Sequence, residues 1–195
     1  MQFKTTSASG MELYDTITPE LADWIAKQPL FFNATAPLDL NGHVNLSPRG
    51  LDTLRILDPQ QVAILDLTGS GNETAAHLTE NGRMTLMFCA FSGPPRILRL
   101  YGQGEVILRE HPDWESLRVL FNPELPAVRQ IFRLQVERIQ TSCGYGVPLM
   151  DLVGQREALI RWSEKKGVKG LREFRDKHNR ESIDGLPTPI VDAQE

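Results

Sequence analysis

The chain has 195 residues, of which 41% are hydrophobic and 24% are charged, and its formal net charge at pH 7 is −4. A chain of this length and composition can bury one hydrophobic core, so we expect a single folded domain without extensive disorder. The acidic balance argues against a dedicated nucleic-acid-binding protein, because such proteins need clustered cations to neutralise phosphates.

Targeting signals and cysteine usage predict the compartment. The N-terminal residues lack the apolar segment of a secretory signal, and no apolar run approaches the roughly 18–20 residues that span a bilayer. The two cysteines, Cys89 and Cys143, are far apart and form no CxxC motif. We therefore expect a cytoplasmic protein that does not engage a membrane, with both thiols reduced and serving as small packing residues.

The first elements expected are a helix and a hairpin. Thr18-Pro19-Glu20 combines an N-cap, a proline at the first helical position and an acid in the first turn, and apolar residues follow at helical spacing. Strands are expected at 30–36 and 44–47. Asn41-Gly42 between them is the dipeptide most typical of a tight hairpin turn, because both of its central positions need positive φ.

The next segment, residues 62–88, is the most informative part of the chain. An apolar strand at 62–67 leads into Gly69-Ser70-Gly71, which is followed by a short helix beginning at Asn72. Asn81-Gly82 ends that helix before another apolar strand at 84–91. A strand, a glycine-rich loop and a helix N-terminus in this order form a plausible phosphate site, because free backbone N–H groups converge there.

The second half adds two long strands and several helices. A strand at 97–108 contains two glycines that indicate a bulge, and a strand at 131–142 alternates apolar and polar residues. Helical stretches are expected at 111–121, 156–166 and 171–178. Six strands with hairpin and bulge signals favour a mainly β fold, a small antiparallel barrel with peripheral helices, over a layered parallel sheet.

The loop at Gly69 does not match either common nucleotide motif. Thr74 stands where a dinucleotide fingerprint has its third small residue, and the following strand lacks the acid that binds a ribose. The lysine of a P-loop is also absent. An ordinary strand-to-helix turn with Asn72 as its cap is the alternative interpretation.

Two other segments carry candidate site residues. Ser47-Pro48-Arg49-Gly50 ends a strand with a hydroxyl, a guanidinium suited to phosphate and a glycine that permits close approach, although a solvated surface turn fits equally well. The segment 141–148 has small residues and Tyr145, which suit a cofactor wall or a subunit contact. Cys143 has no neighbouring base, the four histidines lack metal-ligand spacing, and no GxSxG motif is present.

These three segments, in this order, resemble the pyridoxamine phosphate oxidase-like flavoproteins, the FMN-binding split-barrel superfamily. The match is strongest over residues 31–108, which include HVNLSPRG, VAILDLTGSGNETAAHLTENGRMTLMF and LRLYGQGEVI. The chain looks closer to the broad, poorly characterised branch than to the vitamin-forming oxidases. The resemblance implies a six-stranded antiparallel split β-barrel at 1–150, with a C-terminal helical extension and tail at 151–195 on the same domain. It also implies a homodimer with FMN at the subunit interface.

The resemblance further implies where FMN is held. The strand at 44–49 would lie along the isoalloxazine, and Arg49 and the loop before the short helix would approach the phosphate and ribityl chain. Glu73 and Thr74 replace an Arg-Lys pair of the vitamin-forming enzymes, which shifts phosphate binding towards Arg49, backbone N–H groups and Arg83. No catalytic residue and no metal ligand is assigned. The predicted cofactor-binding residues are Asn45, Ser47, Pro48, Arg49, Gly50, Gly71, Asn72, Thr74, Arg83 and Tyr145.

The expected function follows from the cofactor. A bound flavin carries the redox chemistry itself, so a chain without a triad or metal motif fits an FMN-dependent oxidoreductase with an unknown small substrate or a reduced nicotinamide donor. The alternative is a non-catalytic protein that binds a flavin, a deazaflavin or haem as a cofactor store or redox sensor. Pyridoxamine phosphate oxidation itself is disfavoured by Glu73 and Thr74, and by a C-terminal region without the Arg-and-His motif of those enzymes.

Overall fold

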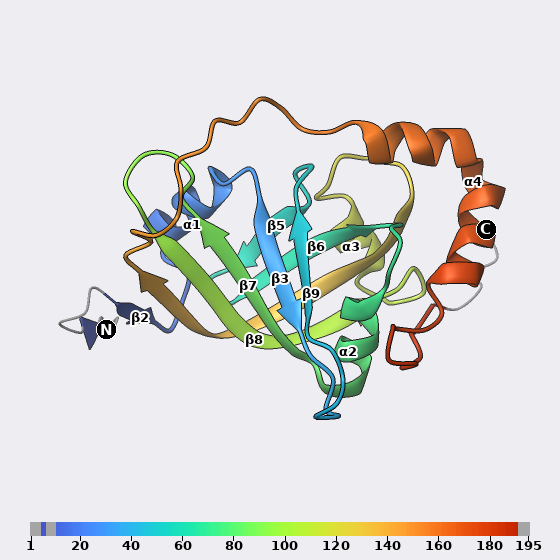
Figure 1. Cartoon of the computed structure of the whole chain (residues 1–195), viewed down its shortest axis with the longest axis horizontal. Coiled ribbons are helices and arrows are strands. Elements are labelled where there is room, and N and C mark those ends of the chain that lie inside the picture. Colours follow the sequence, from blue (N-terminus) through green and yellow to red (C-terminus); the bar gives the residue numbers. More distant parts are fainter. Residues whose placement is uncertain (1–4, 7–10, 191–195) are drawn as a thin grey trace.

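A computed structural model describes residues 5–6 and 11–190, and at its centre is one antiparallel sheet that curls without closing (Figure 1). In the described residues the strand order is β1-β2-β9-β8-β7-β3-β4, and β6 pairs with both β5 and β9. The strands are β1 (Thr5–Thr6), β2 (Glu12–Tyr14), β3 (Phe31–Thr35), β4 (Asn45–Arg49), β5 (Leu54–Asp58), β6 (Gln61–Leu67), β7 (Arg83–Cys89), β8 (Ile97–Ile107) and β9 (Val128–Ser142). The helices are α1 (Pro19–Ala26), α2 (Glu73–Asn81), α3 (Trp114–Arg118) and α4 (Ala158–His178).

The predicted fold class, a split β-barrel of antiparallel strands with peripheral helices, is confirmed. All six predicted strands are present, and the structure adds β1, β2 and β5. The first two are very short, and β5 carries Arg55 and Asp58 and pairs only with β6, so its pattern lacks the apolar signal of a central strand. β4 extends through Pro48 because it lies at the edge of the sheet, where a missing N–H is tolerated.

The predicted bulge in β8 is confirmed at Gly102. The register between β8 and β9 shifts between Tyr101 and Gly102. A Cβ atom on Gly102 would lie 1.9 Å from the carbonyl oxygen of Gln135, so no other residue fits without moving the strand. The two strands thus approach closely at the point where the sheet curls.

The core consists of two apolar clusters on opposite faces of β6. Val62 and Ile64 face the barrel interior together with α1, while Ala63 and Leu65 face a smaller cluster under α3. Both faces of β6 are therefore buried, which explains why its sequence is continuously apolar rather than alternating. Thr18 caps α1 as predicted, with its Oγ1 accepting a hydrogen bond from Leu21 N at 3.3 Å.

After β9 the chain crosses the open end of the barrel before it forms α4 (Figure 1). We call residues 149–157 the strap and residues 179–190 the tail. The two helical stretches predicted for this region are present, merged into α4 but separated at Gly167, whose φ of 64° is non-helical. The predicted domain boundary after residue 150 falls within the strap and stays a prediction. Among the described helices, none has the length and apolarity needed to cross a bilayer.

Candidate cofactor site

A buried carboxylate on β6 lies at the centre of the candidate site. Asp66 is 1% exposed and accepts hydrogen bonds from Arg49 Nη1 at 2.7 Å and from Arg129 Nε at 2.8 Å. Burial alone would raise the pKa of Asp66, but the two guanidinium groups outweigh it and hold that pKa below its ordinary value. Two cations thus share one anion, and the cluster carries a net positive charge.

Arg49 connects this cluster to the sheet edge. Strand alternation places Asn45, Ser47 and Arg49 on one half-buried face of β4, while Leu46 and Pro48 lie on the exposed face. The Arg49 Nε atom donates to Asn33 Oδ1 on β3, and its guanidinium lies 5.3 Å from the ring centroid of Phe132. The Arg49 side chain is therefore held in place by Asn33, Asp66 and Phe132.

Hydrogen bonds extend the network from the sheet to the start of α2. Thr74 Oγ1 accepts from Asn33 Nδ2 at 2.9 Å and from Asn45 Nδ2 at 3.1 Å. Ser47 Oγ donates to Asn45 Oδ1 at 2.9 Å. The HVNLSPRG segment and the GSGNET segment, separate in sequence, thus belong to one polar network.

The loop before α2 leaves the helix N-terminus open. Asn72 is 2% exposed, and its side chain turns inward to accept from Gln130 Nε2 at 2.7 Å rather than capping the helix. Within the described part of the chain, the N–H groups of Glu73, Thr74 and Ala75 have no protein acceptor. Ser70 and Gly71 before the helix are exposed, whereas Thr74 and Ala75 are buried, so the loop is the side from which solvent reaches this helix end.

The loop is held from behind by Arg129 and by the tail. Arg129 Nη1 donates to the carbonyl oxygen of Gly71 at 2.9 Å and to Asn179 Oδ1 at 2.8 Å. Asn179 is fully buried, and its Nδ2 donates to the carbonyl oxygen of Gly69 at 3.0 Å. The net positive cluster therefore contacts the loop directly.

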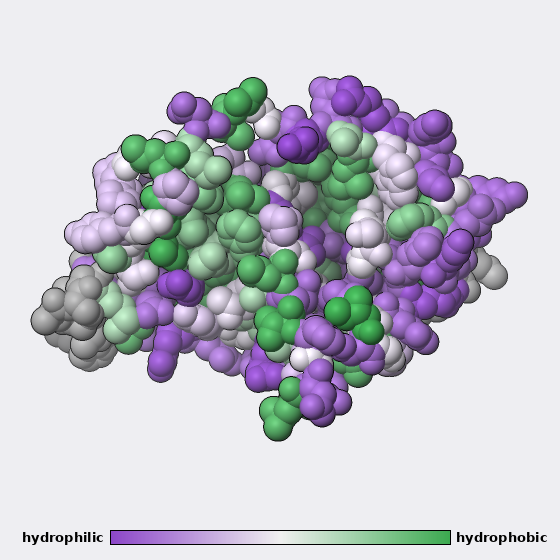
Figure 2. All heavy atoms as spheres, in the orientation of Figure 1, coloured by the Kyte–Doolittle hydropathy of each residue, from purple (hydrophilic) through white to green (hydrophobic). Residues whose placement is uncertain are grey.

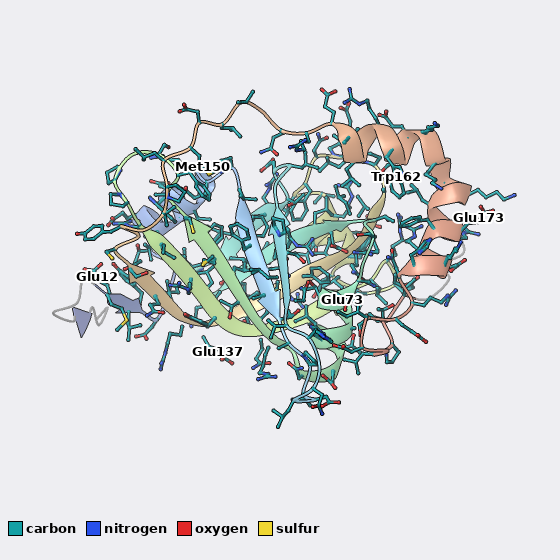
Figure 3. All side chains as sticks on the ribbon, in the orientation of Figure 1. Glu12, Glu73, Glu137, Met150, Trp162 and Glu173 are labelled. Atoms are coloured by element: carbon teal, nitrogen blue, oxygen red, sulfur yellow. The ribbon has the colours of Figure 1, made fainter. Side chains whose placement is uncertain are left out.

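Glu73 is the one acidic side chain at the start of α2. Its carboxylate accepts a hydrogen bond from Ile183 N at 3.0 Å, so the tail holds it (Figure 3). The tail is also tied to the β3–β4 turn, where His43 Nδ1 lies 2.7 Å from Asp184 Oδ1 and the hydrogen bond raises the pKa of His43. The negative charge of Glu73 thus has a partner in the tail, while its Oε1 stays beside the loop, 3.5 Å from where a Cβ on Gly71 would lie.

His77 is the one histidine packed into this region. It is fully buried, its Nδ1 lies 2.9 Å from Thr35 Oγ1, and its Nε2 has no partner in the structure. Burial lowers the pKa of His77, although Glu73, Asp184 and Glu80 act in the opposite direction. Both the full burial of His77 and its lowered pKa fit a packing residue better than a base.

The structure brings most of the predicted site residues together. Asn45, Ser47, Arg49, Asn72 and Thr74 share the polar network. Gly71 lies in the loop, and Pro48 and Gly50 line a groove beside Arg49. The assignment of all eight to a cofactor stays a prediction.

Arg83 and Tyr145 lie outside this network. Arg83 follows the opposite end of α2 and donates to Asn81 and to the carbonyl oxygen of Pro37. Tyr145 is 83% exposed in the loop after β9. Their predicted part in cofactor binding stays a prediction. Cys143, expected to be a packing residue, is exposed, whereas Cys89 is buried.

Among the polar residues that build the site, sequence reasoning missed Asn33, Asp66, Arg129, Gln130 and Asn179. Asp66 has a readable signal, because an acid inside an apolar strand needs a buried partner. Arg129 and Gln130 give a similar signal as adjacent polar residues in β9. Asn179 gives none, since its side-chain partners Gly69 and Arg129 lie 110 and 50 positions earlier in the chain.

Three comparisons with known proteins bear on this site. A family model described as pyridoxamine 5'-phosphate oxidase matches residues 17–143. The chain is 38% identical, over 190 residues, to the pyridoxamine 5'-phosphate oxidase family protein ustO of Aspergillus flavus, covering 89% of this chain and 76% of ustO. The chain belongs to the pyridoxamine 5'-phosphate oxidase family.

Solved structures of a more distant protein agree with the fold of this family member. The crystal structure of HupZ from Group A Streptococcus is 24% identical, with a TM-score of 0.52, and covers 63% of this chain and 91% of HupZ. A single-residue variant of HupZ gives a TM-score of 0.53 at the same identity, covering 63% of this chain and 97% of the variant chain. These likenesses support the split barrel alone. The family match covers β3, β4, β6, α2 and β9, which build the polar network.

Proposed function

We propose that this family member is a flavin-dependent oxidoreductase that binds FMN and acts on a small organic substrate or accepts electrons from a reduced nicotinamide. The observation that carries the proposal is the net positive Arg49–Asp66–Arg129 cluster bonded to a loop whose helix N-terminus is open. Family membership and this anion site both favour a flavin phosphate there. The residues present therefore fit the cofactor.

Different parts of the site would serve different parts of FMN. The N–H groups at the start of α2 would bind the phosphate, with Arg129 supplying charge from behind Gly71. The ring would lie along the half-buried face of β4, which Asn45, Ser47 and Arg49 line. When bound, the flavin supplies the hydride and electron chemistry, and these residues bind and orient it.

We also propose that the protein works as a homodimer in the cytoplasm, with FMN at the subunit interface. β4 is an edge strand in the described sheet, and Leu46 on it and Val44 just before it are 59% and 72% exposed. An exposed edge strand with apolar residues is normally covered by another element or chain. A second copy of this chain would cover it and would bury the neighbouring cofactor site.

The second candidate function is a flavin, deazaflavin or haem store or redox sensor without turnover. One observation favours it: the side chains of Arg49, Asp66, Arg129 and Gln130 bond to one another or to neighbouring protein groups, so they serve binding more readily than proton transfer. The same arrangement suits an oxidoreductase whose flavin carries the chemistry. Turnover distinguishes the two functions.

The test is an absorbance spectrum of the purified protein, with mass spectrometry of the cofactor released on denaturation, followed by anaerobic addition of a reduced nicotinamide. A yellow protein that contains FMN and bleaches supports the oxidoreductase. Yellow protein that no donor bleaches supports the store or sensor. Protein that is colourless and binds no FMN in a titration contradicts both flavin proposals, and a Soret band would identify haem instead.

A further inference from the structure

A groove of about 1180 Å³ lies under the strap, beside the polar network, and Arg49 lines it. Its walls come from the end of α1 with the loop that follows, the end of β4 with the β4–β5 turn, the β7–β8 loop, and the strap with the start of α4. Trp24, Leu30, Phe91 and Met150 give it a mostly apolar lining. Figure 2 shows apolar residues gathered below the strap on this face, and Figure 3 places Met150 at the strap's start. Its size and lining are those of a small-molecule site.

The charged residues of the groove are mainly cations. The side chains of Lys27 and Arg156 have no ion-pair or hydrogen-bond partner among the described residues. Arg96 lies 5.8 Å from the Trp24 ring centroid and 3.7 Å from the exposed carboxylate of Glu20. Asp151 is the one acid among the described lining residues. The groove thus offers uncompensated positive charge next to an aromatic wall.

The strap covers the groove and is fastened at both ends. Met150 N donates to the carbonyl oxygen of Phe91 at 2.8 Å, and Gln155 Nε2 donates to that of Pro29 at 3.2 Å. A Cβ on Gly50 would lie 2.9 Å from Gln155 Oε1. The group that closely approaches Gly50 is therefore the Gln155 side chain of the strap. Residues 151–154 between the two fastenings are exposed. A ligand can therefore lie beneath them without breaking either fastening.

We propose that this groove binds a small organic anion with an aromatic or apolar body. The apolar walls would bury the body, and Lys27, Arg96 and Arg156 would pair with a carboxylate, sulfonate or phosphate at the rim. The proposal does not depend on flavin binding, because the flavin phosphate is assigned to the start of α2. Arg49 borders both sites, so an anion bound here would lie beside a flavin ring on β4.

Isothermal titration calorimetry with 1-anilinonaphthalene-8-sulfonate tests the proposal, using the protein as purified and again with excess FMN. We expect saturable binding at one site per chain in both cases. The double variant Lys27→Gln/Arg156→Gln should weaken binding of this sulfonate by about tenfold and leave binding of the neutral N-phenyl-1-naphthylamine unchanged. The matched control Lys165→Gln/Arg172→Gln changes the same net charge on exposed positions of α4 and should have no effect.

Three results would overturn the proposal: equal weakening in both double variants, no saturable binding, or displacement of the probe by FMN. Displacement would assign the groove to the flavin itself. A colourless protein that still binds the probe would contradict the flavin proposal alone, so the two failures are distinguishable. The variant Trp24→Phe tests whether the probe binds in this groove, because Trp24 lines it. Probe binding should quench the fluorescence of Trp24 in the wild-type protein, and the variant should lack the quenching that comes from Trp24.

Discussion

At the scale of single residues, the buried carboxylate of Asp66 organises the site. It lies between Arg49 and Arg129 and also accepts from Gln130 Nε2 at 2.8 Å. A charge at this depth is tolerated only because it is paired and fully hydrogen-bonded. The same pairing leaves one cation in excess, which is the property an anionic cofactor would use.

Asp66→Asn should destabilise the fold strongly. The amide keeps the volume but leaves two cations in the core without an anion, and breaking a buried pair in this way costs about 3–5 kcal/mol. The free energy of unfolding in urea measures the effect. Asp23→Asn is the control, since Asp23 is exposed on α1. Equal stability of both variants would contradict the assignment of Asp66 as the organising charge.

His77 should make stability depend on pH. Because burial lowers its pKa in the folded state, the unfolded chain binds the proton first as the pH falls below about 6.5. The stability that depends on a neutral His77 is therefore fully present above pH 6.5. It is lost as the pH falls through the lowered pKa of His77 in the folded state. Urea unfolding at pH 7.5 and 5.5 should show a smaller difference for His77→Gln than for wild type. His178→Gln, on an exposed histidine, should keep the wild-type difference.

At the scale of elements, the tail connects α4 to the loop before α2. Asn179 bonds to the carbonyl oxygen of Gly69 and to Arg129, and Ile183 bonds to Glu73. The tail therefore fixes both the shape of the loop and the direction of its one nearby acid. A helix N-terminus binds anions well only when its loop is held in place, since ordering the loop at the moment of binding costs affinity.

Asn179→Ala should weaken FMN binding by about tenfold, because the loop loses the side-chain hydrogen bond at Gly69 and Arg129 behind the loop loses another, each worth roughly 1 kcal/mol. Fluorescence quenching of FMN gives the affinity, and hydrogen exchange of residues 69–72 reports the loop independently of the cofactor. Asn41→Ala, at an exposed position of the β3–β4 turn, serves as the control. Unchanged exchange at the loop would show that the tail does not order it.

At the scale of the whole molecule, the open edge of the barrel and the exposed residues of β4 lie next to the polar network. On one side the barrel is closed by β6, which pairs with β9 and carries β5 on its other edge, and the barrel is left open at β4. A cofactor bound at this edge would remain exposed in one chain. The proposed homodimer would exclude water from it and protect the edge from other pairing.

Leu46→Glu should convert the protein to a monomer, because it places a charge on the exposed apolar face of β4. Light scattering after size-exclusion chromatography measures the mass, and the bound FMN should fall with it. Val168→Glu changes an equally exposed apolar residue on α4 and should leave a dimer. A monomeric wild-type protein, or a dimeric Leu46→Glu variant, would contradict the proposed interface.

The sequence by itself determined the elements and the family. The helix end at Gly82, capping at Thr18 and the bulge glycine Gly102 depend on local backbone geometry, so each can be read from a few neighbouring residues. The tight hairpin turn predicted at Asn41-Gly42 was wrong, because neither residue has positive φ and residues 36–44 form a longer connection between β3 and β4. The HVNLSPRG and GSGNET segments were also recognisable, because motifs are contiguous. β5 was missed since its half-exposed, charged pattern resembles a loop.

Only the tertiary structure decided which groups meet. Arg129 and Asp66 are 63 positions apart, and Asn179 and Gly69 are 110 apart, so no local pattern relates them. In the folded chain Asn72 points inward to Gln130 and does not cap α2. Glu73 is hydrogen-bonded to the tail, and Arg49 is paired with Asp66. The groove under the strap likewise exists only because four separated segments converge. Local interactions specify strands and turns, whereas burial of charge and the shape of a pocket depend on contacts between distant parts of the chain.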